Sequence, residues 1–195
     1  MIDLEILDKS IRRVPDFPKP GILFYDITSI FVQPDAFKYC IDQMVDLYKD
    51  KKIDAVAAVE SRGFLFAAPL LCTCDKVKNI VSVRKSGKLP FNEGDLIEVR
   101  IEKEYGFDTL FYRLSDIAAG AAEGDVFEVT LFDDVLATGG TAEGVARSME
   151  SKKIVIDGKE YGIKIKEFIF LVHLEELGGK SRLESIAPVH TLMDI

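Results

Sequence analysis

The chain has 195 residues, and 25 lysines and arginines against 33 aspartates and glutamates give it a formal net charge of −8. This length fits one large domain, and a content of 48% hydrophobic and 30% charged residues is ordinary for a globular protein. The acidic balance disfavours nucleic acid and anionic membranes as partners, and we see neither a secretory leader nor an apolar run that spans a bilayer, so we expect a soluble cytoplasmic protein.

Short apolar runs alternate with amphipathic stretches along the chain. Apolar side chains at spacings of three and four predict a helix over 35–48, and a nearly continuous apolar run predicts a buried strand over 53–59. Further elements are expected as a helix at about 64–72, strands at 79–83, 126–132 and 168–172, and a helix at about 141–149. Strands that alternate with helices are typical of βαβ units, so the sequence predicts an α/β fold with a mostly parallel, twisted sheet flanked by helices.

Two segments depart from this alternation. Charged and apolar residues alternate within 86–113, so we expect strands with one solvated face that form a small flexible hood. Within 154–165, the pair Asp157-Gly158 favours the tight turn of a hairpin. Neither a repeat nor a linker divides the chain, and residues 1–195 are therefore expected to form a single domain.

The cysteines Cys40, Cys72 and Cys74 and the two histidines of the chain supply a zinc site poorly. We expect all three cysteines to be buried free thiols, as in a reducing compartment.

The strongest chemical signal is the segment LFDDVLATGGT at 131–141. A predicted strand ends in two adjacent carboxylates, and a short loop of small residues leads into a helix. Glycines let the backbone approach a ligand, threonines add hydroxyl groups, and the free N–H groups at a helix N-terminus attract phosphate. Because the carboxylates could accept hydrogen bonds from two neighbouring sugar hydroxyls, the segment predicts a ribose 5-phosphate site made of Asp133, Asp134, Ala137, Thr138, Gly139, Gly140 and Thr141.

This segment resembles the signature of the type I phosphoribosyltransferases, which bind phosphoribosyl pyrophosphate with Mg²⁺. Segments at 11–21, 60–64, 84–90 and 104–106, and the ending at 174–183, are similar to the adenine phosphoribosyltransferase family within that group. The motifs keep the same order over about 10–187. The resemblance implies the type I phosphoribosyltransferase fold, with a base-recognition segment at about 10–31 and a hood at about 86–113. It also implies a purine salvage transferase that converts adenine and phosphoribosyl pyrophosphate to AMP and pyrophosphate.

The resemblance also implies roles for single residues. The pyrophosphate would be held by two loops that each follow a predicted strand, Glu60-Ser61-Arg62 and the cationic set Arg84, Lys85 and Lys88. Glu104, at the edge of the hood, would accept a proton from the imidazole ring of adenine.

Recognition of the base is implied for the backbone of Leu23, Phe24 and Tyr25, with apolar packing from Val135 and with Tyr105 beside the catalytic position. Many relatives carry arginine where this chain has Tyr25. A phosphoribosyltransferase for xanthine or hypoxanthine therefore stays open as an alternative, as does a regulator that senses phosphoribosyl pyrophosphate without catalysis. Mg²⁺ would be carried by substrate phosphates and water and not by dedicated protein ligands. A homodimer is also implied.

Overall fold

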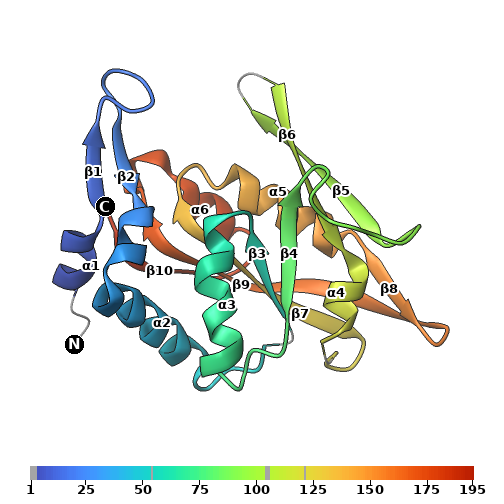
Figure 1. Ribbon diagram of the computed structural model, residues 1–195. Coiled ribbons are helices and arrows are strands. Elements are labelled where there is room, and N and C mark those ends of the chain that lie inside the picture. Colours follow the sequence, from blue (N-terminus) through green and yellow to red (C-terminus); the bar gives the residue numbers. More distant parts are fainter. Residues whose placement is uncertain (1–3, 54, 104–105, 121) are drawn as a thin grey trace.

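The computed structural model describes residues 4–53, 55–103, 106–120 and 122–195, and a central sheet forms its middle layer (Figure 1). The strands of this sheet are β3 (Ala55–Val59), β4 (Ile80–Lys85), β5 (Leu96–Lys103), β6 (Gly106–Arg113), β7 (Val126–Leu136), β8 (Lys153–Ile156), β9 (Lys159–His173) and β10 (Val189–Asp194). Their order is β10-β9-β7-β3-β4-β6-β5, and β8 pairs with β9 beside that path. The five strands from β10 to β4 are parallel, whereas β6, β5 and β8 join antiparallel. The predicted α/β fold with a mostly parallel sheet is confirmed.

Both faces of the sheet are covered. The helices are α1 (Leu4–Ser10), α2 (Pro34–Tyr48), α3 (Arg62–Thr73), α4 (Leu114–Ala118), α5 (Gly140–Glu150) and α6 (Gly179–Glu184), with 3₁₀ turns η1 (Ile27–Val32) and η2 (Glu175–Leu177). Alternate residues of β3 enter different cores: Ala57 and Val59 pack in the core of α5 and α6, and Val56 and Ala58 in the core of α1, α2 and α3. Burial on both faces explains why this strand is apolar throughout.

The second strand of the predicted hairpin and the strand predicted at 168–172 prove to be a single strand, β9. The hairpin expected at 154–165 is present, with both residues of its Asp157-Gly158 turn at positive φ, +50° and +77°. Its second strand does not end there, because β9 continues through the run at 168–172 to His173. The pairing of β9 with β7 shifts by one residue along the way, because Val129 lies opposite Ile165 but Thr130 lies opposite Glu167. The protruding hairpin and the buried central strand are therefore covalently one element, and the prediction of two was wrong.

The predicted hood is an antiparallel pair that continues the central sheet. Its strand β6 pairs with β4, where Arg84 lies opposite Phe111. Ile101 of β5 and Tyr112 of β6 are buried in the same core as α5, and a Cβ on Gly144 of α5 would lie 3.1 Å from the side chain of Ile101. The core therefore extends along β5 as far as Ile101, close to the end of that strand, and the β5–β6 pair rises above the carboxyl edge of the parallel strands (Figure 1).

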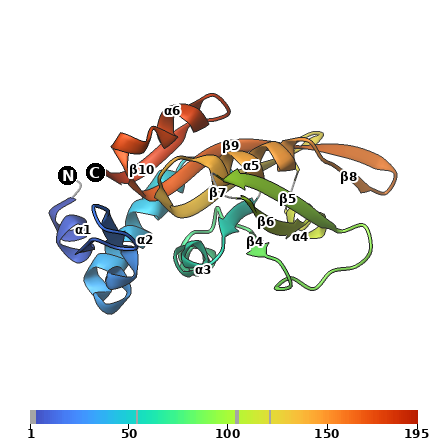
Figure 2. The same cartoon turned by 90° about the horizontal axis from the view of Figure 1, so that it is seen from above.

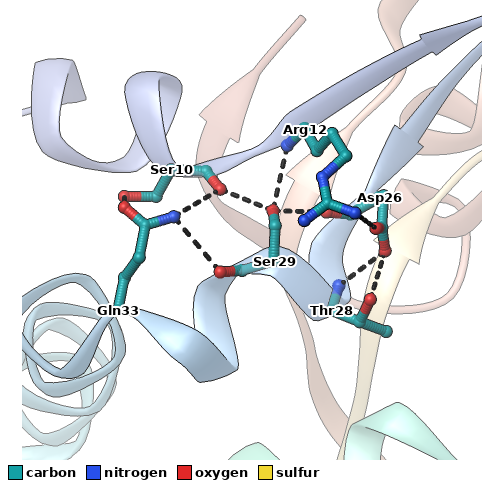
Figure 3. A network of polar contacts seen from close by, with 6 residues as sticks. All are labelled: Ser10, Arg12, Asp26, Thr28, Ser29 and Gln33. Carbon is teal, nitrogen blue, oxygen red and sulfur yellow. Dashed lines mark hydrogen bonds and ion pairs between the residues drawn. The ribbon is translucent and has the colours of Figure 1, made fainter.

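A smaller hairpin rises on the other side of that edge (Figure 1). It consists of β1 (Arg12–Pro15) and β2 (Leu23–Asp26), which no sequence pattern had indicated. A polar network fixes its root (Figure 3). The hydroxyl of Ser29 accepts the backbone N–H of Arg12 at 2.9 Å and lies 2.5 Å from the carbonyl oxygen of Ser10, and the amide of Gln33 donates to that carbonyl at 3.1 Å.

The three cysteines differ in exposure. Cys40 and Cys74 are buried free thiols, but Cys72 is free and exposed, so that expectation was wrong for one of the three. The buried face of α3 includes Phe66, Ala67 and Leu70, and Cys72 lies on the opposite face of this helix.

At the level of the whole molecule, α1 and β10 lie at the end opposite the β8–β9 hairpin (Figure 2). Among the helices described, none has both the length and the apolar character needed to cross a membrane.

Candidate active site

Three loops meet at the carboxyl edge of the sheet because β7, β3 and β4 are parallel neighbours. The loop after β3 carries Glu60 and Ser61, with Arg62 opening α3; β4 ends in Arg84 and Lys85; and β7 leads through the loop at 137–139 into α5. The topology therefore gathers three segments that the sequence separates by up to about 80 residues, in the place where α/β sheets bind ligands.

The loop between β7 and α5 forms a small open cavity. Gly139 has φ of +74°, in the left-handed region that glycine adopts without strain, and α5 begins at the next residue. Because Gly139 has no side chain to cap this helix, the N–H groups of the first turn are available to a ligand. The cavity has a volume of about 100 Å³ and is lined by Asp133, Val135, Leu136, Ala137, Thr138, Gly139, Gly140, Thr141, Ala142 and Phe170.

The two adjacent carboxylates occupy different environments. Asp133 lines the cavity, whereas Asp134 is buried and its Oδ2 lies 2.7 Å from Nε of Arg62. The backbone N–H of Asp134 donates to Oδ1 of Asp133 at 2.9 Å. Burial and the neighbouring charge of Asp134 raise the pKa of Asp133 above its ordinary value, and Arg62 opposes this in part. Of the two carboxylate residues, only Asp133 is thus among those that line the cavity.

Glu60 connects the loops after β3 and β4. Its Oε2 accepts the backbone N–H of Lys85 at 2.9 Å and lies 3.3 Å from Nε of Arg84. The guanidinium of Arg84 also donates to the carbonyl oxygen of Lys88 at 2.9 Å and lies over the ring of Phe64, 5.8 Å from its centroid. A carboxylate thus organises the cationic loop, which leaves the exposed side chains of Lys85 and Lys88 at its surface.

Of the residues expected to recognise the base, Val135 lines the cavity. Leu23, Phe24 and Tyr25 form most of β2, and Tyr25 and Val135 both pack against the core of α1, α2 and α3. The guanidinium of Arg13 lies 5.7 Å from the centroid of the Tyr25 ring. Glu104 and Tyr105 lie outside the described residues.

Two residues that the sequence analysis did not single out help to close the site. A Cβ placed on Gly63 would lie 3.5 Å from both Oδ1 of Asp133 and the carbonyl oxygen of Phe132. These are ordinary van der Waals distances, so the start of α3 packs in contact with the end of β7 at this position. Phe64 supports Arg84 as described above. Their position directly after Glu60-Ser61-Arg62 was the available signal, but the contact partners come from other strands.

The donor groups of this edge fit a hard divalent cation. In the described ranges, no group of three or more histidine, cysteine, aspartate or glutamate side chains is placed to hold a metal. Asp133 does line the cavity, and a cation there would relieve the repulsion between its carboxylate and that of Asp134. Mg²⁺ binds proteins in this way, through one or two carboxylates together with substrate phosphates and water.

Comparison with known proteins gives consistent relatives. A scan against models of protein families finds no match for the chain. The adenine phosphoribosyltransferase of Treponema denticola is 42% identical over 190 residues, which cover 97% of this chain and 89% of that protein. The enzyme of the same name from Wolinella succinogenes is 41% identical over 191 residues, which cover 98% of this chain and 95% of that protein.

Solved structures agree with these relatives. The adenine phosphoribosyltransferase of Rhodothermus marinus superposes with a TM-score of 0.78 at 35% identity, over 98% of each chain. That of Saccharomyces cerevisiae, complexed with adenine and an imino-altritol bisphosphate, gives a TM-score of 0.76 at 33% identity, over 96% of this chain and 97% of that one.

Proposed function

This chain belongs to the adenine phosphoribosyltransferase family, and from that premise we propose how its residues perform the reaction of purine salvage. The enzyme transfers the 5-phosphoribosyl group of phosphoribosyl pyrophosphate to adenine, which yields AMP and pyrophosphate. The observation that supports our assignment best is the cavity lined by Asp133 and the glycine loop, at the same sheet edge as Arg62 and the cationic loop after β4.

The 5-phosphate binds the loop after β7. Ala137, Thr138, Gly139, Gly140 and Thr141 surround it with backbone N–H groups and hydroxyls, at the positive end of α5. Asp133 accepts hydrogen bonds from the ribose hydroxyls, because it is the carboxylate that lines the cavity. Asp134 acts with it by holding Arg62 in place.

The pyrophosphate lies against the loops after β3 and β4. Arg62, Arg84, Lys85 and Lys88 neutralise its charge, and the backbone of Glu60 and Ser61 faces it. The side chain of Glu60 keeps Arg84 and the Lys85 N–H in register. These fixed charges stabilise the pyrophosphate as it gains negative charge on leaving.

The segment at 10–31 and the hood at 86–113 enclose the base within one domain of residues 1–195. Leu23, Phe24 and Tyr25 present backbone groups to adenine, and Val135 and Tyr105 pack on it. Glu104 accepts the imidazole proton while the base nitrogen forms its bond to the anomeric carbon and the bond from that carbon to pyrophosphate breaks. Enclosure keeps water from the electron-poor anomeric carbon.

Mg²⁺ is the cofactor of our proposal. When bound, it supplies positive charge to the pyrophosphate oxygens. It would be carried by the substrate phosphates and water, without dedicated protein ligands.

We also propose a homodimer and a cytoplasmic location. The location is supported by the three free cysteines, which suit a reducing compartment. Sedimentation equilibrium of the full chain tests the dimer, since a monomer at micromolar concentration would contradict it.

The assignment of the base is tested by incubating the enzyme with phosphoribosyl pyrophosphate, Mg²⁺ and one purine base at a time. We expect AMP from adenine and no nucleotide from hypoxanthine or xanthine. A matched incubation with Asp133→Asn, at a phosphoribosyl pyrophosphate concentration below KM, should give at most about a tenth of that AMP. IMP or xanthosine monophosphate as the main product of the unaltered enzyme would contradict the proposed base recognition, and full activity of the variant would contradict the assigned sugar site.

A further inference from the structure

The glycine loop between β7 and α5 rests directly on the backbone of α6. A Cβ placed on Gly179, the first residue of α6, would lie only 2.2 Å from the carbonyl oxygen of Ala137 and 3.0 Å from the backbone nitrogen of Gly139. A Cβ placed on Gly139 would in turn lie 3.0 Å from the carbonyl oxygen of Gly179. Two segments about 40 residues apart therefore meet backbone to backbone, with a glycine on each side.

The α6 side of this contact is anchored and cannot easily move away. Leu183 of α6 is fully buried in the core shared with β7 and β9, and α6 packs against α5, β9 and β10. Arg182 of α6 is also ion-paired with Glu143 in the first turn of α5. A side chain at position 179 would therefore displace the loop, and by roughly 1 Å, since ordinary van der Waals contact begins at 3.4 Å.

We propose that Gly179 is a positioning residue for the phosphate loop at 137–140. It touches neither substrate nor reacting atoms in our scheme. Because it lacks a side chain, α6 can lie in direct contact with the loop backbone, and this contact fixes the position of the loop. This inference rests on the proposed function, which assigns that loop to the 5-phosphate. The shape of a phosphate site made of backbone N–H groups depends on the path of the backbone, so a shift of the loop weakens binding of the phosphate selectively.

The neighbouring glycine provides a matched control. Gly178 has φ of +67°, and a Cβ placed on it meets no atom within 4 Å. Gly178→Ala therefore strains the chain locally and lowers stability without contacting the loop. Gly179→Ala is the same chemical change one residue later, where it collides with Ala137.

The test measures binding of ribose 5-phosphate and of pyrophosphate to the full-length variants by calorimetry, together with KM for phosphoribosyl pyrophosphate. For Gly179→Ala we expect affinity for ribose 5-phosphate to fall at least about tenfold and KM to rise in parallel, with pyrophosphate affinity within about twofold of the unaltered protein. Gly178→Ala should keep both affinities within about twofold. Equal losses in the two variants, or an unchanged affinity in Gly179→Ala, would overturn the proposal.

Two additions keep the outcome interpretable. Thr141→Ala tests the phosphate loop itself: if this variant keeps its affinity for ribose 5-phosphate, the proposed function of the loop is wrong, whatever Gly179 does. Should Gly179→Ala not fold, Leu183→Ala serves instead, because its Cγ lies 3.3 Å from a Cβ on Gly139. Its control is Ile163→Ala, a buried site in the same core near the other end of β9. A loss of ribose 5-phosphate affinity in Leu183→Ala but not in Ile163→Ala supports the proposal, and equal affinities contradict it.

Discussion

Arg62 and Asp134 form an ion pair across the candidate site, and its two members differ in exposure. Nε of Arg62 lies 2.7 Å from Oδ2 of Asp134, and the side chains are 33% and 5% exposed. The Arg62 side chain can contact water, whereas the buried carboxylate of Asp134 is largely desolvated. Loss of Arg62 should therefore destabilise the fold more than loss of the Asp134 charge does.

This asymmetry predicts unequal effects of two substitutions. Arg62→Met leaves a buried charge without its cation and should lower the free energy of unfolding by about 2 kcal/mol. Asp134→Asn keeps the shape of the side chain and leaves an arginine that can turn to solvent, so its effect should stay below about 1 kcal/mol. Urea denaturation at neutral pH measures both.

Arg100→Met is a suitable control for these two variants, because Arg100 and its partner Glu98 are 71% and 43% exposed. It should change stability by less than about 0.5 kcal/mol. Equal losses in Arg62→Met and Asp134→Asn would contradict the interpretation of the pair as an anchored carboxylate.

Asp133→Asn should stabilise the fold while it removes the affinity for substrate. The unfolded chain loses the Asp133 proton near the ordinary pKa of 3.8, whereas the folded protein holds it to a higher pH because burial and Asp134 raise that pKa. The ionised group therefore opposes folding above this range, and stability falls as the pH rises through the raised pKa. The variant lacks this fall.

The measurement for Asp133→Asn is urea denaturation at several pH values between about 4 and 8, combined with calorimetric titration of phosphoribosyl pyrophosphate. We expect affinity to drop at least about tenfold, since hydrogen bonds to a charged group are lost. Asp125→Asn, an exposed carboxylate paired with Lys159, is the control and should leave affinity unchanged. A variant less stable than the unaltered protein at neutral pH contradicts the argument.

Glu143 should stabilise the protein only while it is ionised. Hydrogen bonds from Arg182 and Arg147 lower its pKa below the ordinary 4.5. Its stabilisation is therefore present above about pH 4.5 and is lost as the pH falls through the lowered pKa. Glu143→Gln should lower the free energy of unfolding by about 1 kcal/mol at neutral pH, and the difference should disappear in acid and shrink in about 1 M salt.

Glu5→Gln is the control for this effect, because Glu5 forms an ion pair with Lys9 on an exposed helix surface. Its effect should stay within about 0.5 kcal/mol at any pH. A difference between Glu143→Gln and the unaltered protein that persists in acid would show that packing, and not charge, is responsible.

Glu104→Gln should slow turnover without weakening substrate binding. The amide cannot accept the imidazole proton, so kcat should fall by about 10² or more. The affinity for phosphoribosyl pyrophosphate should be unchanged, because that ligand binds at the sheet edge. Steady-state kinetics and calorimetry measure the two quantities. Glu102→Gln, an exposed hood carboxylate two residues earlier, should keep full turnover. Unchanged kcat in Glu104→Gln excludes this residue as the proton acceptor.

The sequence allowed prediction of those features that local patterns determine. The alanine and valine run of β3 predicted a strand buried on both faces. The strand predicted at 126–132, the glycine loop and the helix predicted at about 141–149 are observed, but the strand continues through Asp133 and Asp134 to Leu136. The β1–β2 hairpin was not predicted, because its two four-residue strands are too short for a clear pattern and are held by a network whose members lie as far apart as Ser10 and Gln33.

What the amino-acid sequence determined by itself was the chemistry available at the sheet edge: adjacent acids, a glycine loop and clustered cations. Only the tertiary structure decided which of these groups pair with one another and which line the cavity. Asp133 and Asp134 are adjacent carboxylates in the sequence, but the packing of α3 against β7 pairs Asp134 with Arg62, whereas Asp133 lines the cavity. Likewise, Gly179 becomes significant only where α6 meets the loop at Ala137. The physical reason is that periodicity and turn propensity act over a few neighbouring residues, whereas desolvation, charge pairing and steric contact depend on which distant segments the packed core brings together.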